Sequence, residues 1–314
     1  MATLTVDQWR ARDRSSTWKE VKRNRWAYLF ISPFYFLYAI FGIFPLFYGL
    51  WLSLHVWDGI SPMQWVAGQN YAKLLVDDIW WQAIGNTVWL FVGATTPQLA
   101  LALILAFIIN SSYIRGKEFF RAAYFMPIVA SAVAVSLIFT SLLGERYGML
   151  NFGLSFLGID KIDWLGSSKW LKPSIALVTI WQWTGYTMII FLAGLQSINP
   201  EIYEAARVDG ATTKDTFRYI TLPLLRPVIL FQVVLAIIGS MQTFDIPVML
   251  AGGTQSSAPG GTGRAGLVSM VLIYWTAFKY QQFGYAAAMA FILFVLIVIF
   301  SLSYNKWQGG NPTD

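Results

Sequence analysis

Cysteine is absent from the 314-residue sequence, and histidine occurs once, as His55. The chain can therefore form no disulfide, iron–sulfur cluster or thiolate metal site. A lone histidine is poor material for a zinc site, so we expect a structural role for His55. The sequence also contains no HExxH, GxSxG or GxxxxGK[ST] pattern and no internal repeat. Neither hydrolytic nor ATP-binding chemistry is therefore indicated for this chain.

Charged residues are the second scarcity, since they make up only 12% of the chain. Globular proteins carry about a quarter charged residues. Hydrophobic residues account for 56% of the chain and include 15 Trp, 15 Tyr and 23 Phe. This composition is typical of a membrane protein.

Six long apolar runs alternate with polar loops. Each exceeds the roughly 20 residues that cross about 30 Å of hydrocarbon, and only the fifth contains a charged residue, Asp245. In lipid these runs must be helices, because every backbone polar group has to be paired internally. The sequence therefore predicts an all-α integral membrane protein with six transmembrane helices, over residues 26–57, 87–109, 122–144, 173–197, 228–250 and 281–305.

Lysine and arginine are distributed unevenly over the loops between these runs. The segments 1–25, 110–121, 196–227 and the C-terminal tail together hold fifteen of the 22 basic residues. Positive residues favour the cytoplasmic side, so both termini and the 196–227 loop are expected there. The net charge of +6 then reflects orientation in the bilayer and not binding to nucleic acid. The expected organisation is a basic cytoplasmic segment (1–25), a membrane domain (26–304) with an outer loop at 251–283, and a cytoplasmic tail (305–314).

The stretch 199–227, NPEIYEAARVDGATTKDTFRYITLPLLRP, has the pattern of two short helices. Asn199 is a good N-cap and Pro200 suits a first helical position, while Gly210 can take the left-handed conformation that ends a helix. A second helix should begin at Thr212 or Thr213 and end at Pro223 and Pro227. Two helices meeting at a glycine between membrane spans suit a docking role, although a simple connector has the same helical pattern.

The spacing EAA-x3-G-x9-I-x-LP within this stretch resembles the EAA motif of ABC-importer permeases. Its positions are Glu204, Ala205, Ala206, Gly210, Ile220, Leu222 and Pro223. Other segments resemble carbohydrate permeases of the maltose, trehalose and glycerol-phosphate type. They are the first apolar run, NYAKL at 70–74, FFRAAYFMPIVASAVAVSLIFTSLL at 119–143, GMLN at 148–151 and QTFD at 242–245 followed by GG.

This resemblance covers residues 26–304 and implies a six-helix permease of type I architecture in the bacterial cytoplasmic membrane. Such a subunit is non-catalytic and binds no cofactor or metal itself, because ATP and Mg belong to partner ATPases. The implied partners are a second permease, two ABC ATPase subunits and an extracytoplasmic sugar-binding protein, besides the lipid bilayer. In the family, the EAA segment docks on the ATPase. The residues expected to couple are Glu204, Ala205, Ala206, Arg207, Asp209, Gly210, Ile220, Leu222 and Pro223.

In this family, the helices before and after the EAA loop line the transport path. The group around Trp183 lies roughly 12–20 Å inside its apolar run, which is too deep for an interfacial aromatic belt. Aromatic faces with amides and hydroxyls suit a sugar, and the absence of Lys and Arg from the spans favours a neutral di- or oligosaccharide. The candidates are Gln182, Trp183, Tyr186, Ser240, Gln242, Thr243 and Asp245.

Three other interpretations remain open. Asp245 could serve as the ion relay of a secondary transporter, although that class favours paired intramembrane charges and two related halves, which the sequence lacks. Asp245 could also be an interfacial structural carboxylate, since it lies near the outer end of its run. An intramembrane enzyme or a scaffold is a weaker alternative. In the outer loop, the glycine-rich stretch 252–266 is expected to be flexible and residues 267–278 to pack on the outer rim.

Overall fold

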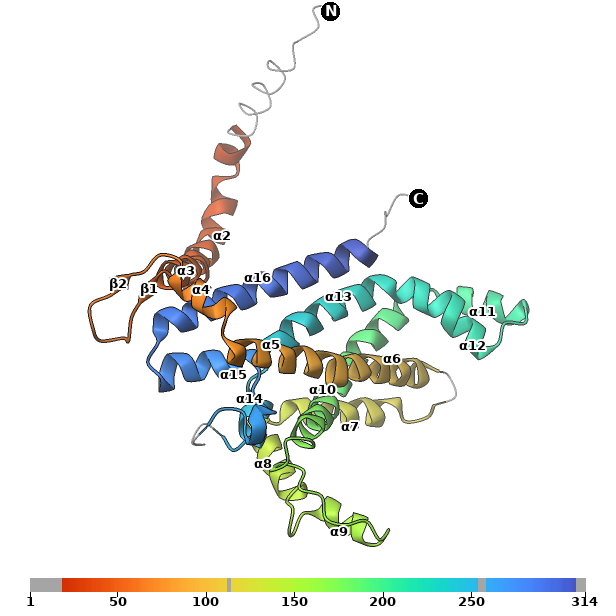
Figure 1. Cartoon of the computed structure of the whole chain (residues 1–314). Coiled ribbons are helices and arrows are strands. Elements are labelled where there is room, and N and C mark those ends of the chain that lie inside the picture. The colour runs from red at the N-terminus through yellow and green to blue at the C-terminus, as the bar shows by residue number, and fades with distance from the viewer. Residues whose placement is uncertain (1–18, 112–113, 254–257, 309–314) are drawn as a thin grey trace, which may run out of the picture.

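The computed structural model describes residues 19–111, 114–253 and 258–308, and this part of the chain is mostly helical (Figure 1). The exception is a small antiparallel hairpin in which β1 (His55–Val56) pairs with β2 (Gln64–Trp65). The remaining residues of the predicted cytoplasmic end segments, 1–18 and 309–314, lie outside the described chain.

Six membrane crossings account for most of the described chain. Five continuous stretches are long and apolar enough to span a bilayer: Arg25–Leu52, Asp78–Asn110, Leu171–Gln196, Thr213–Leu250 and Phe283–Tyr304. The sixth crossing is a broken pair, α7 (Lys117–Val129) and α8 (Ala132–Leu142), which bend by 96° at the break. The predicted number of spans is confirmed when this pair is counted as one.

The helices of each crossing follow in chain order. The first contains α2 (Arg25–Tyr38), η1 (Ala39–Ile43) and α3 (Phe44–Leu52), and the second contains α5 (Asp78–Leu90), η2 (Phe91–Thr95) and α6 (Thr96–Asn110). The fourth is α10 (Leu171–Gln196), and the sixth is α16 (Phe283–Gln308). The fifth contains α12 (Thr213–Asp215), η3 (Thr216–Thr221), α13 (Leu222–Met241) and α14 (Asp245–Leu250). The shorter elements outside the spans are α4 (Gln69–Leu75), α9 (Met149–Ser155), α11 (Pro200–Val208), η4 (Thr262–Arg264), α15 (Ser269–Tyr274) and η5 (Trp275–Lys279).

The break between α7 and α8 corrects the expectation of one straight span over residues 122–144. Ala130 and Ser131 adopt extended backbone conformations, and the Ser131 hydroxyl accepts a hydrogen bond from Ala134 N to cap the new helix. Ser131, four residues after Pro127, is a good N-cap, so the sequence here favours the start of a new helix.

Three of the prolines in the long spans directly follow π-helical turns. The segments η1, η2 and η3 directly precede helices that carry Pro45, Pro97 and Pro223 at their second position. A proline lacks the N–H group and crowds the carbonyl of the preceding turn, and a wider π turn relieves both problems. The prediction that Pro223 and Pro227 end a short helix is therefore wrong, because the helix runs unbroken from Thr213 to Met241.

The core lies where α15 and η5 enter the bundle. Leu267, Val268 and Val271 are fully buried and share a cluster with Trp80 of α5 and Ile175 of α10. Residues 267–278 thus contribute several buried side chains, packed against the starts of α5 and α10, and their placement at the outer side of the membrane stays a prediction. A second cluster joins α6, α10 and α13.

The glycine-rich loop before α15 is fastened to α5. The Asn86 side chain donates hydrogen bonds to the carbonyls of Arg264 (2.9 Å) and Leu267 (2.8 Å), and Thr87 Oγ1 bonds to Ser269. The end of this loop at Arg264 and Leu267 is therefore anchored to α5, and the flexibility of the stretch 252–266 stays a prediction.

His55 has the structural role expected for it. Its ring is buried between Trp51 and Trp65, at centroid distances of 4.1 and 5.0 Å, and its Nδ1 bonds to the Trp51 carbonyl. The buried Asn70 side chain donates to the carbonyls of Ser53 and His55. These contacts fix the hairpin at the end of the first span.

Candidate functional site

The loop over residues 199–227 begins with the predicted helix, α11 (Pro200–Val208). Asn199 caps it, because its Oδ1 accepts a hydrogen bond from Glu201 N at 3.1 Å. Pro200 occupies the first turn, where no intrahelical N–H partner is needed. The start of the helix is therefore determined by residues adjacent in sequence.

Gly210 ends this helix as predicted. Its φ of +80° is left-handed, and Ala211 N donates to the Ala206 carbonyl at 2.9 Å, the pattern of a Schellman motif. Thr212 and Asp215 then form a capping box that starts the next helix, with Asp215 N bonded to Thr212 Oγ1 at 3.2 Å. Each terminus at the turn is thus satisfied by a local partner.

The two helices of the loop fold back on the bundle. Ala206 is the buried residue of α11, and the Tyr203 hydroxyl lies 3.4 Å from Thr221 Oγ1. On the following helix, Phe217 packs edge-to-face against Phe107 of α6, at 4.8 Å between ring centroids. These contacts hold the loop against the ends of α6 and α13.

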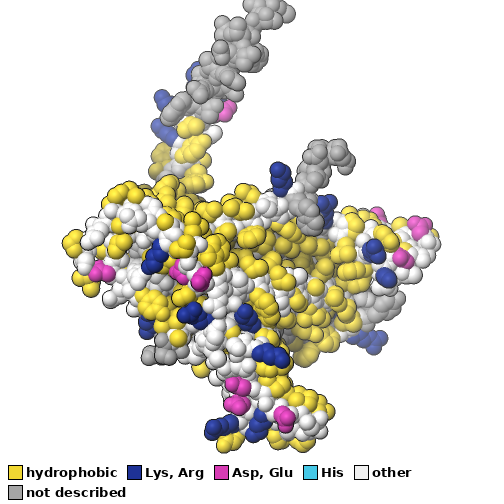
Figure 2. Space-filling model, in the orientation of Figure 1, with side chains coloured by type: hydrophobic (Ala, Val, Ile, Leu, Met, Phe, Trp, Pro, Cys, Tyr) yellow, Lys and Arg dark blue, Asp and Glu magenta, His cyan; other side chains and the backbone are white. Residues whose placement is uncertain are grey.

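The rest of α11 is uncovered. Glu204 and Arg207 form a pair at 3.8 Å, and both side chains are about two-thirds exposed. Val208 is 87% exposed and Ala205 is also exposed. Figure 2 shows charged side chains of both signs gathered with apolar ones over α11 and α12. Such a mixture provides both apolar area and charge for a partner protein.

The nine predicted coupling residues divide by accessibility. Ala206 is buried, and Ile220 and Leu222 are partly buried. The exposed members are Glu204, Ala205, Arg207, Asp209, Gly210 and Pro223. The structure thus brings the EAA residues onto one protruding element while the later motif residues lie at the base of α13.

The candidate path residues on α10 have different environments. Trp183 and Tyr186 are exposed and form an edge-to-face pair at 6.0 Å. Gln182 is buried, and its Nε2 lies 3.4 Å from the Ala130 carbonyl at the break between α7 and α8. Its Oε1 has no hydrogen-bond partner among the described residues. The amide therefore contacts the bent helix pair in this structure.

The candidates after α13 lie around a helix break. Gln242 is exposed where α13 ends, Thr243 is partly buried, and Ser240 Oγ donates to the Ile237 carbonyl of its own helix. Asp245, predicted inside a span near its outer end, is exposed in the first turn of α14, within the candidate span Thr213–Leu250. A carboxylate is favourable at that end of a helix. Although α10 packs against α13 and α14, no hydrogen bond or aromatic contact in the described chain joins the two sets.

A buried polar network lies between the helices, and the residues whose side chains form it are not among the predicted path residues. Gln98 Nε2 donates to Thr187 Oγ1 (2.9 Å) and to the Trp183 carbonyl (3.1 Å), and Gln232 Nε2 donates to Thr187 Oγ1 (3.3 Å). All three side chains are buried, and they link α6, α10 and α13. Isolated amides within apolar runs were the available signal, but their pairing depends on how the helices pack.

Glycine allows α10 and α7 to approach closely beside this network. A Cβ atom at Gly185 would collide with the Tyr124 carbonyl. α7 is therefore held on α10 by close backbone contact at Gly185, and the break at Ala130 is held by Gln182.

The geometry agrees with comparisons to known proteins. The family described as "Binding-protein-dependent transport system inner membrane component" matches residues 87–306. The chain is 35% identical to the lactose transport system permease protein LacF of Rhizobium radiobacter, over 92% of this chain and 95% of that protein. It is 36% identical to the multiple sugar-binding transport system permease protein MsmF of Streptococcus mutans, over 92% and 97%.

A solved structure shares the fold. In the crystal structure of a bacterial ABC transporter involved in the import of the acidic polysaccharide alginate, one chain matches with a TM-score of 0.80 and 25% identity, over 93% of this chain and 98% of that chain. The family match covers well over half of the chain, and the sugar-permease relatives align along almost their whole length. The chain therefore belongs to the family of binding-protein-dependent transport system inner membrane components, as a permease subunit of an ABC sugar importer.

Proposed function

We propose that this permease carries a neutral di- or oligosaccharide and that α11 transmits the work of partner ATPases to the membrane helices. The main support for the proposal is α11, which is capped by its own residues and exposed on the surface of the chain. A tight glycine turn joins it to one unbroken helix. The lactose and multiple-sugar names of the relatives agree with sugar as cargo.

The ATPase contact is assigned to the exposed face of α11. Glu204 and Arg207 are free to exchange their weak mutual pair for charges on a partner, because an exposed pair at 3.8 Å contributes little to folding. Ala205 presents no bulky side chain, so a groove can approach the helix backbone. Gly210 sets the angle at which α11 meets the next helix.

The continuous helix from Thr213 to Met241 supports coupling over distance. At 1.5 Å per residue it is about 42 Å long, so a displacement of α11 and α12 is carried as a rigid-body motion to the break at Gln242. Closure of the ATPases would push at one end of this helix and reorient the exposed residues near Asp245 at the other.

A second permease is assigned to the uncovered first span. None of the apolar window of Arg25–Leu52 is buried within this chain, and the helix projects from the bundle in Figure 1. Its aromatic surface includes Phe30 (85% exposed) and Phe41 (75% exposed). Two ATPase subunits and an extracytoplasmic binding protein complete the proposed assembly. One of the matched alginate transporter structures was solved with a pentasaccharide-bound periplasmic protein.

The proposal also covers the orientation of the chain in the membrane and the charge of its transport path. The end of α16 lies on the same side of the molecule as α11 and α12 (Figure 1), which supports a cytoplasmic C-terminus and loop, with the N-terminus on the same side from the distribution of basic residues. The stretches 173–197 and 228–250 contain Asp245 but no Lys or Arg. A path with this charge disfavours anionic sugars, so a neutral sugar is proposed for this chain.

The test is isolation of the tagged chain from its native membrane in mild detergent, followed by ATPase measurements with neutral and acidic sugars. We expect recovery of an ATPase, a second permease and a binding protein, with hydrolysis stimulated by a neutral di- or oligosaccharide. Stimulation by an acidic sugar alone would overturn the substrate assignment. Recovery of the chain alone, transporting in vesicles under an ion gradient, would overturn the coupling assignment and make Asp245 the centre of the mechanism.

A further inference from the structure

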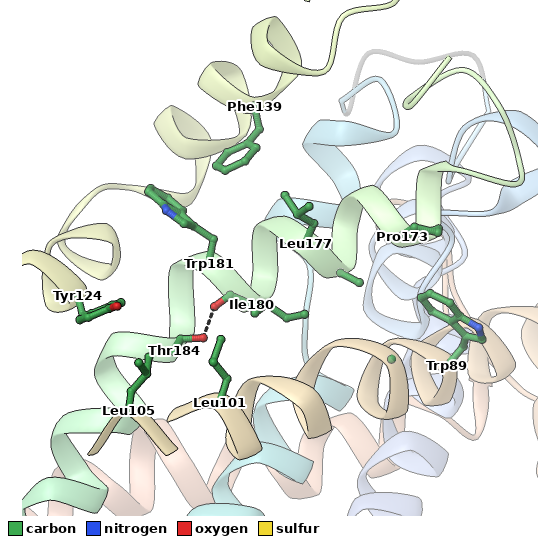
Figure 3. Close-up of a pocket in the computed structure, with 12 residues that line it drawn as sticks. Trp89, Leu101, Leu105, Tyr124, Phe139, Pro173, Leu177, Ile180, Trp181 and Thr184 are labelled. Atoms are coloured by element: carbon green, nitrogen blue, oxygen red, sulfur yellow. Dashed lines mark hydrogen bonds between the residues drawn. The ribbon is translucent and has the colours of Figure 1, made fainter. Parts of the chain in front are cut away.

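An apolar groove runs along the bundle. None of its lining residues belongs to the coupling loop (residues 199–227) or to the candidate path residues. Figure 3 shows this cavity of about 650 Å³, which lies between α5–α6, the bent pair α7–α8, and α10. Its walls include Trp89 and Leu101 on one side, and Leu177 and Trp181 on the other, with Phe139 of α8 above Trp181.

The lining is mostly apolar, and its polar side-chain atoms belong to Tyr124, Trp89, Trp181 and Thr184. Thr184 is a hydroxyl-bearing residue in the wall, and its Oγ1 already donates to the Ile180 carbonyl one turn earlier (Figure 3). The groove opens to the outside of the chain, because Leu177 and Trp181 are each about half exposed. An apolar groove on the outside of a membrane-spanning bundle is accessible to lipid tails.

The length of the groove matches one leaflet. On α10 the lining runs from Pro173 to Thr184, which at 1.5 Å per residue is about 16 Å. Half of the roughly 30 Å hydrocarbon core is about 15 Å. One acyl chain lying along α10 would therefore extend from the membrane surface to the midplane.

Positive charge lies at one end of this groove. Lys172 Nζ is 6.0 Å from the Trp89 ring, next to Pro173 where the lining begins. Arg264 lies nearby, because its carbonyl accepts from Asn86, one helical turn before Trp89. The loop that carries Arg264 also adjoins the loop before α10, since a Cβ at Gly263 would lie 3.2 Å from Ser168 Cβ.

The segment that leads into α10 carries two lysines at this end of the groove. Lys169 is exposed beside Lys172 in sequence, and its Nζ lies 5.7 Å from the Trp170 ring. Asp163 is the preceding acidic residue along the chain, and its carboxylate accepts from Gly166 N at 2.7 Å within its own turn. Lysine beside tryptophan at the end of a span is an arrangement that suits the headgroup region of a bilayer.

We propose that this groove binds an anionic phospholipid, with one acyl chain along α10 and the headgroup phosphate at Lys172. Lys169 and Arg264 add longer-range attraction for the phosphate. The site lies in the leaflet that surrounds the start of α10, and it does not depend on the identity of the sugar or on ATPase docking. A bound lipid would brace the bent α7–α8 pair against α6 and α10.

The test uses the intact importer, with all of its subunits, in lipid vesicles. Phosphatidylglycerol and phosphatidylcholine with the same photoactivatable acyl chain are compared, and labelled peptides are mapped by mass spectrometry. We expect labelling within residues 173–184, about fivefold stronger for phosphatidylglycerol, since one basic residue near the surface contributes roughly 1 kcal/mol.

Two variants and one control separate headgroup from tail. Lys172→Gln should lower phosphatidylglycerol labelling about fivefold and leave phosphatidylcholine labelling unchanged. Leu177→Trp, which fills the groove from its exposed edge, should reduce labelling by both lipids. Lys161→Gln, at an exposed lysine of the preceding loop, should change neither. Each variant is checked for yield of the assembled complex.

Two outcomes would overturn the proposal. Equal labelling by the two lipids, unaffected by Lys172→Gln, would remove the anionic headgroup site. The absence of label within residues 173–184 in the intact complex, including a groove filled by a neighbouring subunit, would remove lipid binding altogether.

Discussion

The coupling loop and the candidate transport path differ in what holds their side chains in place. In the loop, Asn199, Gly210 and the pair Thr212–Asp215 each make their defining contact within five residues along the chain. Along the path, Gln182 is held by Ala130, more than fifty residues away in sequence.

The shape of the loop is thus set by contacts between neighbours in sequence, whereas the position of Gln182 in the path is set by a contact between helices. The caps and the turn of the loop are formed by neighbours in sequence, so this part can move as a unit and transmit force. Tyr203 and Phe217 connect it to Thr221 and to Phe107 of α6. The path depends on which faces of α10, α13 and α14 meet, so its lining can change when those helices shift. A permease needs both properties, because a rigid coupling loop can drive transport only if the helices that line the path can rearrange.

The largest effect on transport is expected from disrupting the turn at Gly210. Gly210→Pro imposes φ near −65° where the structure has +80° and removes the N–H that donates to Arg207. We expect uptake to fall by 100-fold or more, on the order of 3 kcal/mol, measured as labelled-sugar accumulation in cells, with membrane insertion unchanged.

Gly158→Pro is the matched control for the turn. Gly158 also has a left-handed φ, +71°, and lies in a loop outside the spans with nothing near its Cβ position. Its replacement should leave most uptake intact. Normal uptake by the Gly210→Pro protein would remove the coupling role of this turn.

Charge reversal on α11 should have the next largest effect. Glu204→Lys places a cation beside Arg207 on the exposed face and opposes whatever positive group a partner offers there. We expect uptake and ATPase recovery in pull-downs to fall about tenfold. Thermal stability should hardly change, because the exposed Glu204–Arg207 pair contributes little.

Glu145→Lys supplies the same charge change on an exposed residue of a loop beyond α8. It should leave ATPase recovery unaffected. Equal losses in the two variants would mean that the net charge of the chain, and not the α11 face, controls assembly.

Substitutions in the path should alter sugar handling without loosening the ATPases. Trp183→Ala removes one half of the exposed aromatic pair with Tyr186, and Asp245→Asn removes the carboxylate of α14. We expect a three- to tenfold rise in KM for uptake, about 1 kcal/mol, with ATPase recovery retained. Unchanged kinetics in both variants would contradict the path assignment.

The sequence was informative where contacts are local. It identified the cap at Asn199, the turn at Gly210 and the family motif, and it located six spans because hydrophobic length needs no tertiary information. It failed at Pro223, where a π turn upstream lets the helix continue. It could not show how much of residues 267–278 is buried, because that burial depends on the rest of the bundle. It could not show that Gln182 meets Ala130, since that contact follows from the bend between α7 and α8.

The buried network formed by Gln98, Thr187 and Gln232 allows the most specific test of how the helices pack. Thr187→Val removes the hydroxyl that accepts from both Gln98 and Gln232, so two buried amides lose a partner. Hydrogen bonds between membrane helices average about 0.6 kcal/mol, so we expect a loss of about 1–2 kcal/mol, read as a lower midpoint of thermal unfolding in detergent. Thr179→Val is the control, because Thr179 bonds only within its own helix, to Ile175.

Gln232→Met should cost less than Thr187→Val, for a reason specific to this network. The Gln232 Oε1 has no partner among the described residues, so its removal also removes a buried unsatisfied atom. Thr187 would keep its bond from Gln98, and the helices would stay linked. If Gln232→Met proves the more damaging change, then its carbonyl is paired in the assembled importer, and α13 meets a partner there that this chain alone does not supply.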